Sequence, residues 1–328
     1  MIILKQPLFV VSLDFEKMWG VFDKRTINTY GGNIANVDLV IARLLALFEK
    51  YHIHCTWATV GMLFHQDIQS CKNRYPTVLP AYKNSKFSSY YHLNEISSDS
   101  FNIFYSGAVS IKLIKDIPNQ EIATHTYSHF YCLEDGSSVE AFSNDLEMAI
   151  NISKENGFET NSIVFPRNQY NKAFLDICSK MGIKTYRGTE SSWVQRSRNQ
   201  KELKITHRVI RFIDSYINIT GFNIYKQLEI NDQKLICIPA SFFLRPFNPK
   251  LSYFEEFKVR RIKDSMLRAA MEGSLFHLWW HPHNFGKNLE ENMCQLESIL
   301  IYYSELKTKY GMLSKTMNEV ANEYIYEK

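Results

Sequence analysis

Two hydrophobic patterns alternate along this chain, and each predicts a different element. Residues 8–13 are apolar nearly throughout, which is typical of a strand buried on both faces of a parallel sheet. Residues 36–50 repeat their apolar positions with a helical period. The residues on this stripe are Val37, Val40, Ile41, Leu44, Leu45 and Phe48. Gly31, Gly32 and Asn33 before it predict a flexible turn, and residues 53–62 after it a second strand.

The alternation of strand and helix patterns continues to the C-terminus. We expect strands at residues 121–124, 162–165, 183–188, 235–240 and 275–280. We expect helices at residues 108–114, 137–156, 172–181, 253–271, 289–310 and 315–324. This gives six or seven strand–helix units and indicates an α/β fold.

The polar residues at the strand ends distinguish between two kinds of α/β fold. Polar clusters follow four predicted strands that lie far apart in the sequence. A barrel brings such ends to one rim, whereas an open sheet gathers its ligand at one crevice. We therefore expect one distorted (β/α)7-type barrel, forming a single domain over residues 1–328, with C-terminal helices over about 289–328.

One long segment interrupts the pattern. Residues 66–107 lack clear periodicity and are rich in Tyr, Ser and Asn. A segment of this length in a compact enzyme is usually a lid, a binding loop or an oligomer contact. We predict that this insertion loop covers the rim and shapes the substrate site. Tyr90, Tyr91 and His92 either line a sugar site or pack against the barrel.

Composition narrows the classes of function. The chain is 45% hydrophobic and 22% charged, as expected for a globular protein, and the net charge of +4 with no dense basic run excludes a nucleic-acid stripe. The first apolar run is too short for a signal peptide, and no apolar stretch is long enough to span a membrane. The six cysteines form no CxxC pair, so reduced thiols and a cytoplasmic location are expected.

The candidate chemistry lies at the strand ends. His125 and His129 stand four residues apart, a spacing that suits a divalent metal if the backbone is helical or turns tightly. Such spacings also arise by chance among ten histidines, so the interpretation depends on other stretches. Asp14 and Glu16 project to the same side after the first strand. His281 follows a strand at the rim, while His277 lies deeper and is expected to be a core histidine.

Four motifs, SLDFE, QEIATHTYSH, FPRNQ and LWWHPHN, in this order and spacing, resemble the polysaccharide deacetylases (carbohydrate esterase family four). The resemblance covers about residues 8–285, and the histidine motif is its most specific part. The run THTYSHFYCLE, with FPRNQ after it, is similar to branches found in bacterial surface-polysaccharide gene clusters.

The resemblance implies a role for each matching residue. Glu16, His125 and His129 would bind a metal, and Asp14 would be the general base that activates water. Arg167 would hold Asp14 and keep it ionised, and His281 would be the general acid. Two histidines and a carboxylate suit Zn²⁺ but also Fe²⁺, Co²⁺ or Ni²⁺.

Two assignments stay open because the sequence departs from the family pattern. The third motif usually has Arg before Pro, whereas here Pro166 precedes Arg167, so Arg187 is a competing partner for Asp14. His283 competes with His281 as the acid, and strand phase and the His-Pro match favour His281.

We therefore expect a metal-dependent hydrolase that removes an N-acetyl group from an amino sugar in a bacterial surface-glycan precursor, such as lipopolysaccharide or capsule. One alternative is hydrolysis of another C–N bond, such as a cyclic amide. Another is a catalytically silent carbohydrate-binding protein, which the complete set of base, ligands and acid opposes.

Overall fold

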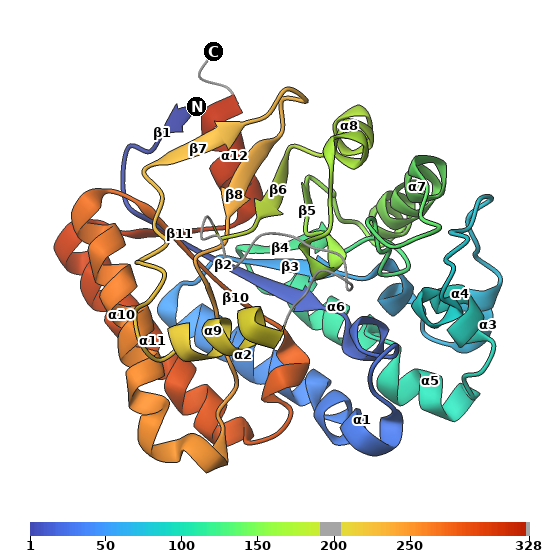
Figure 1. Ribbon diagram of the computed structural model, residues 1–328, viewed down its shortest axis with the longest axis horizontal. Coiled ribbons are helices and arrows are strands. Elements are labelled where there is room, and N and C mark those ends of the chain that lie inside the picture. Colours follow the sequence, from blue (N-terminus) through green and yellow to red (C-terminus); the bar gives the residue numbers. More distant parts are fainter. Residues whose placement is uncertain (191–204, 326–328) are drawn as a thin grey trace.

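The fold is built around a mainly parallel sheet, seen at the centre of Figure 1. The computed structural model describes residues 1–190 and 205–325. Residues 326–328, at the end of the predicted C-terminal helical region, lie outside this part. The parallel strands, in order across the sheet, are β8 (Ile236–Pro239), β6 (Thr185–Gly188), β5 (Ser162–Ile163), β4 (Gln120–Thr124), β3 (Cys55–Thr59), β2 (Leu8–Phe15), β10 (Leu275–Trp280) and β9 (Phe242–Phe243).

A bent segment closes this sheet into a barrel. β8 pairs with β6, and β9, which begins three residues after β8, pairs with β10 on the other side. In the bend, the amide of Ala240 donates to the carbonyl of Gly188 (3.0 Å) and the amide of Ser241 to that of His277 (2.9 Å). With β8 and β9 counted as one bent strand, seven strands surround the barrel. The predicted distorted (β/α)7-type barrel is confirmed.

Three further strands extend the sheet outside the barrel wall. β1 (Ile2–Ile3) and β7 (Gln227–Ile230) pair antiparallel and continue the sheet beyond β8, and β11 (Leu313–Lys315) pairs with the first half of β2. The sequence did not predict these strands, because two to four residues are too few to show a period.

Helices surround the sheet (Figure 1). Most predicted helices are present with shifts of a few residues at their ends. The longer helices are α1 (Ile27–Ala35), α2 (Val37–Tyr51), α6 (Ala108–Asp116), α7 (Val139–Glu155), α8 (Lys172–Lys180), α9 (Ile205–Asp214), α10 (Glu255–Glu272), α11 (Leu289–Tyr310) and α12 (Met317–Ile325).

One prediction about a turn is wrong. The Gly31–Gly32–Asn33 segment is not a flexible turn but part of α1, where Gly31 lets the helix approach Phe104 closely. The insertion loop contains short helices, and polar N-caps start each of them. These helices are α3 (Ile68–Lys72), η3 (Ser85–Phe87), α4 (Ser89–Leu93) and α5 (Ser98–Phe104). Helices of three to seven residues are too short to give a readable period.

One helical stretch among the described residues, Ile27–Tyr51, is long and apolar enough to cross a membrane by length and composition. It is divided into α1 and α2 at Asn36. The apolar stripe predicted for α2 is fully packed inside the protein, with every stripe residue at most 4% exposed. Core packing therefore accounts for the apolar character of α2.

The orientation of α2 can be tested with two leucines on opposite faces of the same helix. Leu44 is fully buried, whereas Leu39 is 53% exposed. We expect Leu44→Ala to lower the free energy of unfolding by about 2–5 kcal/mol, because it leaves a cavity. Leu39→Ala should change it by less than about 0.5 kcal/mol. Urea unfolding of both variants measures the difference, and equal losses would contradict this packing.

Candidate active site

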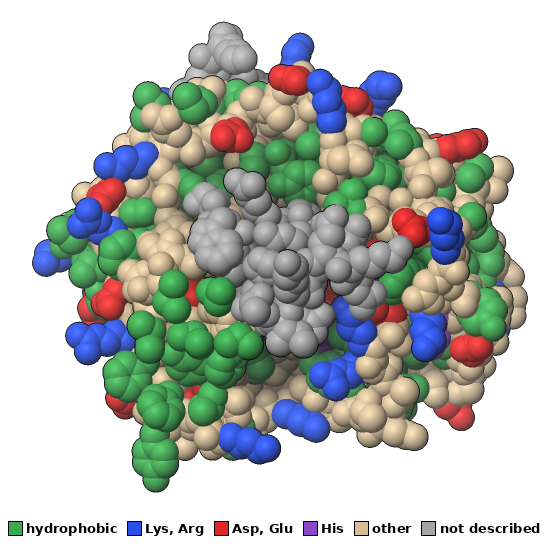
Figure 2. All heavy atoms as spheres, viewed as in Figure 1, with side chains coloured by type: hydrophobic (Ala, Val, Ile, Leu, Met, Phe, Trp, Pro, Cys, Tyr) green, Lys and Arg blue, Asp and Glu red, His purple; other side chains and the backbone are tan. Residues whose placement is uncertain are grey.

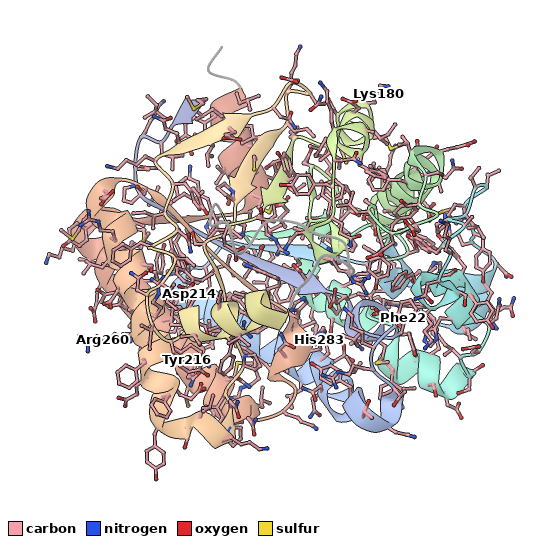
Figure 3. The ribbon with its side chains drawn as sticks, viewed as in Figure 1. Phe22, Lys180, Asp214, Tyr216, Arg260 and His283 are labelled. Atoms are coloured by element: carbon pink, nitrogen blue, oxygen red, sulfur yellow. The ribbon has the colours of Figure 1, made fainter. Side chains whose placement is uncertain are left out.

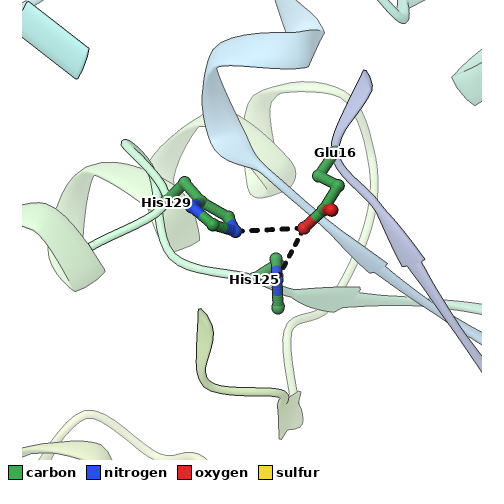
Figure 4. A group of neighbouring side chains, drawn as sticks. All are labelled: Glu16, His125 and His129. Atoms are coloured by element: carbon green, nitrogen blue, oxygen red, sulfur yellow. Dashed lines mark hydrogen bonds and ion pairs between the residues drawn. The ribbon is translucent and has the colours of Figure 1, made fainter. Parts of the chain in front are cut away.

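The C-terminal ends of the barrel strands bring three buried side chains together at one point, shown in Figure 4. Glu16 follows β2, His125 follows β4, and His129 lies four residues further on. The Oε2 atom of Glu16 is 3.3 Å from Nε2 of His125 and 3.0 Å from Nε2 of His129. One ligand atom from each residue lies within 4.8 Å of the other two.

The two histidines are set by a tight loop and not by a helix. Thr126 and His129 both have left-handed backbones, with φ of 63° and 58°. This loop places the two imidazole rings 5.0 Å apart. Nδ1 of His125 lies 2.7 Å from the carbonyl oxygen of Val164, so it donates there and presents the Nε2 lone pair to the centre.

Asp145 on α7 stabilises this loop through hydrogen bonds. Its buried carboxylate accepts from the amides of Tyr127 (2.7 Å) and Ser128 (3.2 Å) and from the hydroxyls of Tyr90 (3.2 Å) and Ser128. Burial raises the pKa of Asp145 to about 6, against these hydrogen bonds, which lower it. The sequence analysis missed Asp145, although a carboxylate within the buried stripe of α7 is a readable signal.

Two glycines make space for the site. A Cβ atom on Gly20 would lie 1.9 Å from Cδ of Glu16, so a side chain there would displace this carboxylate. A Cβ atom on Gly61 would lie 2.8 Å from the Cα of Tyr127, within the loop of residues 125–129, called the histidine loop. The amide of Gly61 also donates to the carbonyl of Thr126 at 2.9 Å. The segment after β3 therefore supports the loop directly.

Asp14 is held by Arg187 and not by Arg167. The guanidinium of Arg187 donates to both oxygens of Asp14 (2.6 and 2.8 Å) and stacks over the ring of Trp279. Both members of the pair are buried. The implied contact between Arg167 and Asp14 is thus corrected. Arg187 lies on β6 and faces the barrel interior, as Asp14 does on β2.

Arg167 makes a different set of contacts. It follows β5 in a left-handed turn with Asn168 (φ of 54° and 53°), which directs its side chain to Asp23 and Glu134. Its guanidinium also stacks over the ring of Tyr131, which meets His129 edge-on at 5.1 Å. Arg167 therefore supports the wall beside His129.

Charges in the site keep both carboxylates ionised. Burial would raise the pKa of Asp14, but Arg187, with help from His125 and His281, outweighs it and lowers the pKa below its ordinary value. Burial would also raise the pKa of Glu16, yet His281, His125 and His129 hold it well below the ordinary range. Two acceptor groups are therefore available for a cation at neutral pH.

His281 and His283 both face the carboxylates but differ in access. Nε2 of His281 lies 3.6 Å from Oδ2 of Asp14 and 3.5 Å from Oε1 of Glu16, and its side chain is 22% exposed. His283 is buried, and burial together with the nearby His281 lowers its pKa to about 3. At that pKa His283 carries no extra proton at neutral pH, which favours His281 as a proton donor. Figure 3 labels His283 within this region.

His277 lies deeper in the barrel, as predicted. It is fully buried, with Nε2 2.8 Å from the hydroxyl of Ser12. Burial, together with the charge of Arg187, lowers the pKa of His277 to about 3, so it remains neutral.

The insertion loop forms one wall of a cavity of about 730 Å³. The opposite wall comes from residues 18–28, which follow Glu16 directly. Across one part of it, the ring of Phe22 stacks on His92 with centroids 4.6 Å apart. Tyr91 and His92 line this cavity, whereas Tyr90 is buried against Asp145. Tyr90 therefore packs inside the protein, whereas a role of Tyr91 and His92 in a sugar site stays a prediction.

The residues at the centre fit a divalent metal. Glu16, His125 and His129 converge through one carboxylate oxygen and two imidazole nitrogens, a donor set that suits Zn²⁺ and other first-row divalent ions. Nδ1 of His125 is occupied by a backbone carbonyl, as is usual for a metal-ligating histidine.

Comparison with known proteins gives the fold. No family model matches the sequence, and no curated protein matches it. A protein of Mycobacterium smegmatis assigned as a polysaccharide deacetylase is 13% identical, with a TM-score of 0.59 over 97% of this chain and 91% of its own. The allantoinase Puue is 12% identical, with a TM-score of 0.57 over 98% and 90%. This chain therefore has the fold of polysaccharide deacetylases and of this allantoinase.

The same barrel also occurs in a branching enzyme. The GH57 branching enzyme of Thermococcus kodakaraensis is 12% identical, with a TM-score of 0.58 over 98% of this chain and 72% of its own. At these identities the likeness concerns the fold, so function has to be argued from the site.

Asp145 offers a test of how the histidine loop is supported. We expect Asp145→Ala to lower the free energy of unfolding by about 1–3 kcal/mol, because buried amides lose their acceptor. Metal affinity should fall about 10–100-fold, as for other residues that orient ligands. Glu147→Ala, on the exposed face of the same helix, is the control. Calorimetry and metal titration measure both effects, and unchanged metal affinity in Asp145→Ala would contradict this role.

Proposed function

We propose that this protein is a metal-dependent hydrolase that removes an N-acetyl group from an amino sugar in a bacterial surface-glycan precursor, such as lipopolysaccharide or capsule. One observation carries the proposal. An arginine-held carboxylate, Asp14, and a partly exposed histidine, His281, lie beside the Glu16–His125–His129 group. Base, metal ligands and acid are what amide hydrolysis needs in one place.

Each residue has a distinct task in this proposal. A divalent metal bound by Glu16, His125 and His129 would supply Lewis-acid activation of water and of the amide carbonyl. Asp14, ionised beside Arg187, accepts the proton of the attacking water. His281 gives a proton to the departing amine nitrogen, which would otherwise be a poor leaving group. Tyr91 and His92, in the cavity by the insertion loop, contact the rest of the sugar.

A cyclic amide is the second candidate substrate. The allantoinase with this fold has nearly the same TM-score as the polysaccharide deacetylase, so the fold favours neither. The acid–base pair would serve both, because each reaction breaks a C–N amide bond. An assay of amine release from N-acetylated sugars beside ring opening of a cyclic amide separates the two candidates.

We also propose that the reaction takes place in the cytoplasm. All six cysteines of the chain are free, and four of them are buried. Reduced thiols of this kind are usual in a reducing compartment. A sugar precursor that is assembled inside the cell would be met there.

Five substitutions separate metal binding from proton transfer. Glu16→Ala should remove most of the bound metal, and so should His125→Ala and His129→Ala. Asp14→Asn should retain the metal and lower turnover by about 10²–10⁴-fold, since it removes only the base. His281→Ala should behave like Asp14→Asn. Metal analysis of the purified variants beside the amine-release assay provides the measurement.

Three results would overturn these roles. Loss of metal in Asp14→Asn with retention in Glu16→Ala would exchange the two carboxylates. Full metal content in both His125→Ala and His129→Ala would remove the metal site and the proposed hydrolase with it. Metal binding without any amide hydrolysis would favour the silent carbohydrate-binding protein.

The two arginines give a separate test through pH. Removing Arg187 leaves burial as the main influence on Asp14, so its pKa rises. We expect the acidic limb of the kcat/KM profile to move to higher pH in Arg187→Met. Unfolding should become easier by about 3–5 kcal/mol, because a buried charge loses its partner.

Arg167→Met is the matched control, because Arg167 contacts Asp23 and Glu134 instead. The acidic limb of its kcat/KM profile should lie at the same pH as in the wild type. Arg187→Lys, which keeps the charge, serves if Arg187→Met does not fold. An acidic limb that moved in Arg167→Met but not in the Arg187 variants would restore Arg167 as the partner of Asp14.

A further inference from the structure

A patch of exposed apolar side chains lies beside the mouth of the barrel. It is formed by α9 and the residues after it, and by η6 (Pro249–Phe254) with the first turn of α10. Figure 2 shows these hydrophobic side chains gathered at the lower left of the molecule. The apolar patch consists of residues exposed by 40–93%, namely Phe212, Ile213, Ile217, Tyr253, Phe254 and Phe257. Contiguous exposed patches of this kind mark interaction sites.

A groove of about 290 Å³ runs through the apolar patch. Leu251 and Tyr216 line it together with members of the patch. The hydroxyl of Tyr216, which Figure 3 labels, donates to Glu255 at 3.1 Å. This bond joins the end of α9 to the start of α10, so both sides of the groove are fixed to each other.

The polar residue at the end of α9, Asp214, points into the protein. Asp214 is buried and accepts from the amides of Ile219 (2.9 Å) and Thr220 (2.7 Å). Phe212 and Ile213, just before it, face outward. A surface helix usually shows the opposite arrangement, with its apolar face on the core. Exposure of the apolar residues is thus built into the way the helix is anchored.

Positive charge is concentrated next to the apolar patch. Residues 245–268 contain seven basic and three acidic residues. Lys258, Arg261 and Glu255 among them are buried, which leaves five basic and two acidic residues, a net charge of +3. Among these basic residues, Lys250 and Arg260 are exposed, and Figure 3 labels Arg260 at the edge of the molecule. Aromatic side chains next to exposed cations are typical of surfaces that bind anionic membranes.

The apolar patch is continuous with the active site. The ring of Phe243 lies 5.5 Å from that of His281. The guanidinium of Arg245 lies 5.9 Å from the ring of Phe243 and 5.5 Å from that of Phe212. One cation and one aromatic ring therefore separate the patch from the proposed acid.

We propose that the apolar patch docks the protein on an anionic lipid bilayer, where the active site meets its amino sugar as the headgroup of a lipid. The second half of this proposal rests on the proposed function, whereas docking does not. Apolar side chains enter the bilayer boundary, and Lys250 and Arg260 face the lipid phosphates.

A second copy of the chain fits this surface less well. In a two-fold dimer the same patch meets itself, so the exposed basic residues of this segment, such as Lys250 and Arg260, would face their own copies. Like charges in such an arrangement oppose association. Tyr253 is 93% exposed and projects from the surface, which suits insertion into a soft boundary.

Vesicle sedimentation tests the docking directly. We expect the full chain to bind phosphatidylcholine vesicles that contain phosphatidylglycerol, and to bind pure phosphatidylcholine more weakly. The triple variant Tyr253→Ser, Phe254→Ser, Phe257→Ser should lose binding by about tenfold or more. Lys250→Gln and Arg260→Gln should each weaken binding to the anionic vesicles by about fivefold.

The matched control is Val109→Ser with Ile301→Ser, since both residues are exposed apolar side chains on other helices, at 66% and 47%. This control should bind vesicles as the wild type does. Absence of wild-type binding, or equal loss in the control, would overturn the proposal. So would a dimer in sedimentation velocity that the triple variant abolishes, because the occupant would then be a second copy.

The metal-free variant His125→Ala separates this proposal from the proposed function. It should bind vesicles as the wild type does, because docking requires no metal. Vesicle binding without hydrolysis of any amide leaves docking in place and refutes the proposed function. Amide hydrolysis without vesicle binding leaves the proposed function in place and refutes docking.

Discussion

The burial of two carboxylates at the end of one strand is the constraint on which this site depends. β2 is buried along its whole length, and Asp14 and Glu16 lie at its end inside the barrel. Charges removed from water are costly unless they are paired. Arg187 compensates the cost of burying Asp14 through two hydrogen bonds to its carboxylate. The neighbouring histidines stabilise the charge of Glu16.

The sequence predicted those parts of the site that follow from the positions of strand ends and from the alternation of side chains along a strand. Strand phase placed Asp14 and Glu16 on one face, and the histidine motif lay at the end of β4 as expected. The barrel followed from the spacing of these strand ends, because only a closed sheet brings them together.

What the sequence did not show depends on backbone conformation and on long-range contacts. A left-handed turn at Arg167 and Asn168 directs that arginine away from Asp14, and nothing in FPRNQ indicates it. The contact between Arg187 and Asp14 joins residues 173 positions apart, which no local pattern encodes. The helices of the insertion loop are too short to show a period, and α1 includes a glycine pair that usually marks a turn.

The bend between β8 and β9 has a consequence for how this protein can evolve. Ala240 bonds to β6, which carries Arg187, and Ser241 bonds to β10, which leads to His281. Side chains alternate between the two faces of a strand. Inserting or deleting one residue in the bend would therefore turn the side chains of β9 to the opposite face relative to those of β8. Arg187 and His281 would then no longer be held in the same position relative to each other. We expect the length of this segment to be far less free to vary than its side chains.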